Sequence, residues 1–157
     1  MELSRVLDVL RAFERERVDY VLVGAVALAL HGLARATQDI GLFVAPRPDN
    51  VERAKAALRS VFHDPSIDEI GAGDLGGAYP TIRYVPEEDF FVVDLIGSLG
   101  EAIRYEDLEV EEREIQGVRV RIATPRALYR MKRDTVRPID RADADALKRR
   151  FAIEDGD

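Results

Sequence analysis

Residues 20–44, YVLVGAVALALHGLARATQDIGLFV, constrain the fold of this chain more than any other segment. The first four are aromatic and β-branched residues that favour a strand, and Gly24 lets the backbone turn closely after them. The Ala- and Leu-rich stretch 25–30 then favours a helix, which Gly32 ends. The segment therefore predicts a strand, a tight glycine turn and a short helix in immediate succession.

A second strand is predicted over residues 39–44. Because side chains alternate along a strand, Asp39, Gly41 and Phe43 share one face, and the apolar residues between them share the other. Asp39 thus places a carboxylate at the start of an apolar strand. A charge in that setting is unfavourable unless it has a partner, so a function is expected for it.

The residues Gly24-Ala25, His31-Gly32, Arg35, Thr37 and Asp39 form a spaced pattern of a glycine turn, an H-G helix end and R-x-T-x-D. This pattern resembles the nucleotidyltransferase superfamily, in particular its small bacterial AbiEii-type and minimal members. The resemblance implies a polymerase beta-like α/β fold, a small mixed sheet flanked by helices. It also implies that Gly24, Ala25, Arg35 and Thr37 bind the nucleotide, with the glycine turn at its phosphates.

The resemblance further implies that two strand aspartates, one residue apart, hold a divalent ion, Mg2+ or Mn2+. Asp39 is the first, but this chain has Gly41 where the family has the second. Asp94, a charge within the apolar run 90–96, is expected to supply a carboxylate from a neighbouring strand; a buried structural carboxylate is the alternative. Asp39 and Asp94 are therefore the predicted catalytic and metal-binding pair. Because glycine offers no ligand, nucleotide transfer is predicted to be impaired.

The rest of the chain predicts helices and strands on both sides of this segment. Before residues 20–44 we expect an amphipathic helix, whose apolar residues are Leu3, Val6, Leu7, Leu10 and Phe13. Directly after them we expect a helix that begins with a capping box at Asp49 and ends at about Phe62. Then follow a glycine-rich loop over 63–80, strands over 81–85 and 90–96, the second buried on both faces, and a hairpin turning at Gln116-Gly117. The last elements are a helix capped by Thr124 and one opened by Pro138, with Ile139, Ala142, Ala146, Leu147 and Phe151 on its apolar side.

The C-terminal helices also fit the resemblance, which has a lysine helix followed by R-x-x-D. Lys132 and Arg137 are candidates to meet triphosphate oxygens. The alternative is that they pair with acidic helix residues or stay solvated. His31 is predicted to be a packing or helix-end residue rather than a catalytic base.

Composition limits the remaining classes of protein. A chain of 157 residues is expected to form one domain over 1–153, with a disordered tail over 154–157. The absence of cysteine excludes disulfides and thiolate metal sites. The longest apolar run is broken by Gly24 and too short to span a bilayer, so a cytoplasmic protein with no membrane partner is expected.

Charge is unevenly distributed along the chain. The net charge of -7 argues against nucleic-acid binding by the whole surface. Residues 121–150 nevertheless carry ten basic against four acidic residues. This basic segment either complements the acidic remainder or faces phosphate.

The sequence therefore predicts a metal-dependent nucleotidyltransferase that moves an NMP group from an NTP to an RNA, protein or small-molecule acceptor. The resemblance adds a role as the toxin of a toxin–antitoxin pair, with an antitoxin protein as partner. The competing hypothesis is a module that has lost transfer and binds a nucleotide or a partner protein.

Overall fold

A computed structural model describes residues 2–34, 36–76, 80–87, 91–99, 103–133, 135 and 137–154. Its centre is a six-stranded mixed sheet in the order β3-β4-β2-β1-β8-β7. The strands are β1 (Tyr20–Val23), β2 (Asp39–Val44), β3 (Thr81–Tyr84), β4 (Val92–Ile96), β7 (Val110–Ile115) and β8 (Val118–Ala123). A separate short pair consists of β5 (Ser98–Leu99) and β6 (Ile103–Arg104).

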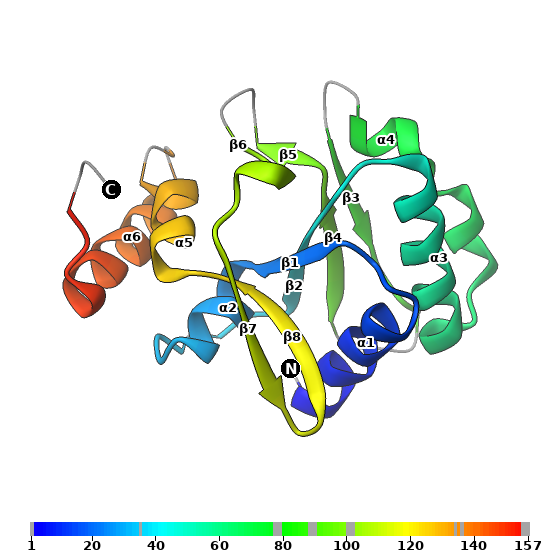
Figure 1. Ribbon diagram of the computed structural model, residues 1–157, viewed down its shortest axis with the longest axis horizontal. Coiled ribbons are helices and arrows are strands. Elements are labelled where there is room, and N and C mark those ends of the chain that lie inside the picture. The colour runs from blue at the N-terminus through cyan, green and yellow to red at the C-terminus, as the bar shows by residue number, and fades with distance from the viewer. Residues whose placement is uncertain are drawn as a thin grey trace.

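Helices flank the sheet at its two ends. They are α1 (Leu3–Arg15), α2 (Gly24–Leu30), α3 (Pro48–Phe62), α4 (Ala72–Gly76), α5 (Pro125–Lys132) and α6 (Pro138–Phe151). Two short 3-10 helices are η1 (Pro65–Glu69) and η2 (Tyr105–Asp107). Figure 1 shows α1, α3 and α4 gathered at one end of the molecule and α5 and α6 at the other. Among the residues that the structure describes, every helix is too short or too polar to traverse a bilayer.

The strand pairing explains how distant parts of the sequence meet. β2 lies between β1, to which it is antiparallel, and β4, to which it is parallel. β3 pairs with β4 in the antiparallel sense, and β1 pairs with β8 in the parallel sense. The two aspartate-bearing strands are far apart in the chain, with ample length between them for the crossover that a parallel pair needs, and they are direct neighbours in the sheet.

The two faces of the central strands differ in burial. One face is closed, because Leu22, Ile40, Leu42, Val93 and Leu95 are at most 1% exposed. Each such side chain contributes about 1.5–3 kcal/mol by leaving water. The other face carries Asp39 and Asp94 and is partly open. The core thus holds the strands in register while one face of β2 and β4 stays accessible.

Several predicted elements are confirmed. The strand, glycine turn, helix and second strand of residues 20–44 are present as β1, α2 and β2, with Gly32 in a left-handed conformation after α2. Gln116 and Gly117 both have positive φ, as the tight turn of the β7–β8 hairpin requires. The Thr124 hydroxyl accepts a hydrogen bond from the backbone N–H of Ala127 and caps α5.

Other local predictions are wrong. α3 starts at Pro48 and is capped by Arg47 without a side-chain bond, so Asp49 is not its N-cap. Proline at the first turn already has a helical φ and fixes the start of α3 two residues earlier than predicted. The predicted loop 63–80 contains η1 and α4. β4 alternates between buried and half-buried residues rather than being buried on both faces.

The predicted apolar side of α6 is confirmed at Leu147 and is wrong at Ile139 and Phe151. Ile139 is 42% and Phe151 36% exposed, whereas the helix buries Asp140, Asp143, Ala144 and Leu147. Two aspartates can face inward because the side chain of Lys132 lies against both. Arg35, Phe90 and residues 155–157, which carried sequence predictions, lie outside the described residues.

Candidate functional site

Asp39 and Asp94 come together on the open face of the sheet. In the parallel register of β2 and β4, Asp39 is opposite Val92 and Gly41 is opposite Asp94. Both aspartates therefore point to the same side of the sheet, two positions apart. The side chain of Asp39 is 45% exposed and that of Asp94 is 18% exposed. The sequence prediction that these distant acids converge agrees with this arrangement.

A residue that the sequence reasoning missed, Arg83, lies between the two acids. It is opposite Asp94 in the antiparallel register of β3 and β4. Its Nε donates to Oδ1 of Asp94 at 3.1 Å, and its Nη2 lies 3.4 Å from Oδ2 of Asp94 and 3.4 Å from Oδ2 of Asp39. One guanidinium thus touches both carboxylates. Alternation along the predicted strand 81–85 already placed Arg83 on one face, but its partner strand was not fixed by the sequence.

The cationic group of this site is an exposed arginine. The Arg83 side chain is 60% exposed. Its pKa is raised, first by the hydrogen bond to Asp94 and then by the negative charges of Asp94 and Asp39. Arg83 is therefore cationic, and it offsets the repulsion between two neighbouring carboxylates.

The predicted nucleotide-binding residues that the structure describes lie at the β1–α2 turn and just before β2. Gly24 has φ +74°, and a Cβ built on it would meet nothing within 4 Å, so its backbone borders open space. Ala25 is 7% exposed and lies in the first turn of α2. Thr37 fixes the start of β2, because its hydroxyl accepts a hydrogen bond from the Asp39 N–H at 3.1 Å. Thr37 thus orients the aspartate that follows it.

A small cavity of about 190 Å³ lies between the sheet and the C-terminal helices. Val23, Gly24 and Ile96 form its sheet side. α5 contributes Leu128, Met131 and Lys132 to the opposite wall. Ile96 lies on the same face of β4 as Asp94, so the cavity adjoins the acidic pair.

Lys132 already forms ion pairs with two aspartates in this structure. Its Nζ lies 3.2 Å from Oδ1 of Asp140 and 2.9 Å from Oδ2 of Asp143, and all three side chains are at most 12% exposed. The Thr135 hydroxyl adds a hydrogen bond to Asp140 at 3.2 Å. This cluster attaches α6 to α5. Arg137 is different: its side chain is 72% exposed, and its Nε is 3.8 Å from Asp140.

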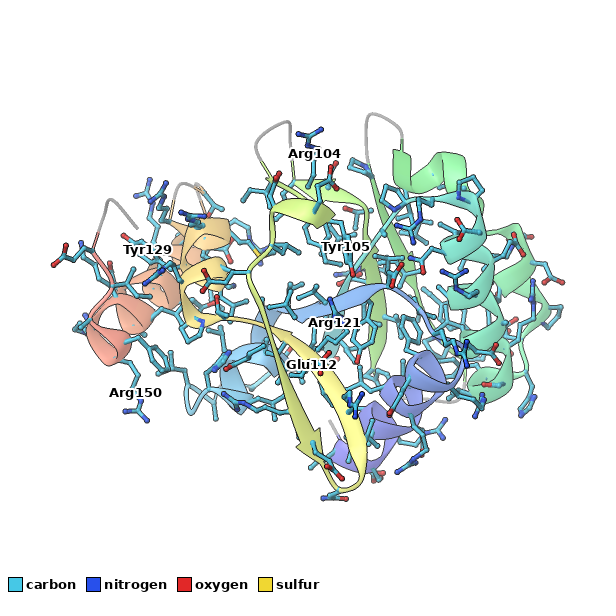
Figure 2. The ribbon with its side chains drawn as sticks, in the orientation of Figure 1. Arg104, Tyr105, Glu112, Arg121, Tyr129 and Arg150 are labelled. Carbon is cyan, nitrogen blue, oxygen red and sulfur yellow. The ribbon has the colours of Figure 1, made fainter. Side chains whose placement is uncertain are left out.

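Other basic residues of the C-terminal segment also find acidic partners. Arg121 of β8 lies 3.4 Å from Glu112 of β7 (Figure 2), and Arg126 lies 3.9 Å from Glu109. These contacts favour internal complementarity for this part of the segment. His31 is buried, with Nε2 2.9 Å from the carbonyl oxygen of Ala123, which supports its predicted packing role.

Gly41 occupies the position between the two acids and β1. A Cβ built on it would lie 3.2 Å from Cγ2 of Val23 and 3.4 Å from the Val23 carbonyl oxygen. The backbone is therefore packed tightly where the resemblance has a further aspartate. Within the described part of the chain, no three acidic or histidine side chains are arranged to hold a metal ion.

The residues that are present still fit a single divalent ion. Asp39 and Asp94 both reach one guanidinium within 3.4 Å, so their oxygens converge on a common point. Hard oxygen ligands are those that Mg2+ prefers, and Mg2+ commonly takes only one or two carboxylates, with water and substrate phosphate completing its shell. The donor set therefore suits one ion, and it does not suit a pair held by three carboxylates.

Comparison with solved structures shows what this arrangement of strands and helices is. The crystal structure of ANT(2'')-Ia in complex with adenylyl-2''-tobramycin superposes with a TM-score of 0.57 at 16% identity, over 94% of this chain and 88% of that chain. This chain has the nucleotidyltransferase fold. The solution structure of ANT(2'')-Ia, described as an antibiotic-resistance factor, covers 95% of this chain and 90% of its own at 16% identity, with a TM-score of 0.48. No protein-family model and no curated protein matches the sequence.

Proposed function

We propose that this protein binds a nucleoside triphosphate together with one divalent ion, Mg2+ or Mn2+, at Asp39 and Asp94, and transfers the nucleoside monophosphate to an acceptor. The observation that carries the proposal is the convergence of these two carboxylates on a single cationic group on the open face of β2 and β4. The nucleotidyltransferase fold supports the reaction class.

In the proposed site, the two aspartates bind the ion, and the glycine turn and a C-terminal arginine face the phosphates. Asp39, oriented by Thr37, and Asp94, fixed within β4, hold the ion. The bound ion supplies neutralisation of phosphate charge. The open backbone at Gly24 leaves room for phosphate to approach closely. Arg137 is better placed than Lys132 to turn toward phosphate, because its side chain is exposed and its contact with Asp140, at 3.8 Å, is long.

Gly41 sets the expected rate. With two carboxylates rather than three, the site holds one ion and lacks a ligand for a second that would activate the attacking oxygen. We therefore expect the protein to bind the triphosphate but to transfer its nucleoside monophosphate slowly. The same feature supports the second candidate function, a nucleotide-binding or partner-binding module that has lost transfer.

The proposed acceptor is a small molecule, an RNA or a protein. ANT(2'')-Ia was solved with adenylyl-2''-tobramycin, a nucleotide joined to a small molecule, which supports a small-molecule acceptor. The resemblance to AbiEii-type proteins supports RNA or protein as the acceptor, with this chain as a toxin and an antitoxin as its partner. Within the basic segment, Arg121, Arg126 and Lys132 are paired with acidic residues of the protein itself, which argues against an RNA acceptor held by these three cations.

Calorimetric titration tests the proposal. ATP, CTP, GTP and UTP are titrated with and without Mg2+ into the natural protein, Asp39→Asn and Asp94→Asn. We expect Mg2+-dependent binding of at least one triphosphate, weakened about tenfold or more by either substitution. Asp68→Asn is the matched control, because Asp68 also pairs with an exposed arginine, Arg59, away from the site.

Transfer is measured separately, with radiolabelled triphosphate and with RNA, protein and an aminoglycoside as acceptors. Labelled product that depends on Asp39 supports the enzyme. Metal-dependent binding without product supports the second candidate. The absence of binding in every titration rejects the enzyme and the nucleotide-binding form of the second candidate.

A further inference from the structure

Arg83 fills the position at which a cation would be held. Its guanidinium contacts Oδ1 and Oδ2 of Asp94 and Oδ2 of Asp39, at 3.1 to 3.4 Å. These are the carboxylate oxygens assigned above to the divalent ion. A guanidinium and an ion cannot occupy the same space between two carboxylates, so only one of them is bound at a time.

The contact is one that can be exchanged. Arg83 lies on β3, at the edge of the six-stranded sheet, and its side chain is 60% exposed. Long side chains at exposed sites change rotamer within nanoseconds. An ion pair of this exposure adds little to folding stability, so tying β3 to β4 is a weak reason for its presence. The backbone pairing of Thr81–Tyr84 with β4 already makes that connection.

We propose that Arg83 competes with the divalent ion for Asp39 and Asp94, so that the ion binds only when the guanidinium swings away. The arginine thereby keeps two neighbouring carboxylates neutralised and aligned in the metal-free protein. Once released, its cationic fork is available to the phosphate groups that arrive with the ion. This inference rests on the proposed function, because it assumes that the two aspartates bind a divalent ion.

Removing the competitor should strengthen ion binding. Mn2+ alone is the probe, and its free concentration is followed by electron paramagnetic resonance. We expect Arg83→Gln to bind Mn2+ about tenfold more tightly than the natural protein, since a unit charge close to the site no longer opposes the ion. Arg83→Lys keeps the charge but cannot bridge both carboxylates as a fork, so its affinity should lie between the two.

Arg59→Gln is the matched control. It removes the same charge from an arginine that is 41% exposed and paired with Asp68. Its Mn2+ affinity should equal that of the natural protein. An equal gain in Arg59→Gln and Arg83→Gln would mean that only the net charge of the protein matters, and would overturn the competition.

A second readout follows Arg83 itself. In ¹H-¹⁵N spectra, the Nε–H signal of Arg83 should shift and exchange faster with water when diamagnetic Mg2+ is added. An unchanged signal at saturating Mg2+, or equal Mn2+ affinity for Arg83→Gln and the natural protein, overturns this inference alone. If neither protein binds Mn2+ in a way that Asp94→Asn abolishes, the ion site of the proposed function is absent and both proposals fall together.

Discussion

Gly41 and Asp94 are direct partners in the parallel register of β2 and β4. On its other side Gly41 is paired with Val23 of β1, whose Cγ2 would lie 3.2 Å from a Cβ at position 41. A larger residue there would face the acidic pair and press on Val23 at the same time. The backbone position that limits the metal site is therefore also a packing constraint.

Gly41→Asp is expected to add a third carboxylate to the site. Mn2+ affinity should rise about tenfold, because another hard oxygen ligand joins Asp39 and Asp94. Gly41→Asn is the matched control, because it brings the same contact with Val23 without the charge. Similar Mn2+ affinity in both variants would contradict the expectation. Val23→Ala in the Gly41→Asp background should recover stability in thermal unfolding, and the double-mutant cycle measures that contact.

Lys132→Met is expected to destabilise the attachment of α6. Removing the amine takes the ammonium of Lys132 away from two inward-facing carboxylates, those of Asp140 and Asp143, at a cost of about 3 kcal/mol. Denaturant unfolding measures this loss. Adding Asp140→Asn and Asp143→Asn to the same variant should recover most of it. An unchanged midpoint in Lys132→Met would show that the cluster does not hold the helix.

Arg137→Gln separates phosphate binding from structural pairing. Because the Arg137 side chain is 72% exposed and lies 3.8 Å from Asp140, its loss should leave the unfolding midpoint unchanged. Triphosphate affinity should fall about tenfold if its guanidinium meets phosphate. Arg126→Gln is the control for charge, because Arg126 is also an exposed arginine and its acidic partner, Glu109, lies 3.9 Å away. Equal affinities in the two variants would remove Arg137 from the site.

Tyr20 should make folding stability depend on pH in alkaline solution. Burial raises the pKa of its hydroxyl to about 12 from the ordinary 10.0. Because this pKa is raised in the folded protein, the folding stability that the protonated hydroxyl contributes is complete below pH 10 and is lost as pH rises toward 12. The expected loss is about 2–3 kcal/mol over this window. Tyr20→Phe, measured by denaturant unfolding, should lose less over the same range, and an equal loss would assign the effect to other groups.

Gly97→Ala should destabilise the end of β4. A Cβ at this position would lie 2.0 Å from the carbonyl oxygen of Leu75, so the backbone of α4 must move. We expect a loss of about 2 kcal/mol in thermal unfolding. Gly73→Ala in α4 is the control, because a Cβ there meets nothing within 4 Å and alanine favours a helix. A stabilised Gly97→Ala would show that α4 does not pack against this strand end.

Local sequence was sufficient where a single physical rule decides the structure. The β1–turn–α2–β2 segment follows from strand propensity, the positive φ that Gly24 allows and helix-favouring alanines. Thr124 before Pro125 similarly marks the start of α5. The wrong face of α6 shows the limit of such rules, because periodicity counts apolar residues and does not foresee that Lys132 allows two aspartates to be buried.

The sequence by itself singled out the two candidate acids, Asp39 from its motif and Asp94 from its charge within an apolar strand. Only the tertiary structure decided that Arg83 lies between them and that Gly41 is pressed against Val23. The physical reason is that side-chain alternation along a strand is local, whereas the choice of neighbouring strand and its register depends on how the whole core packs.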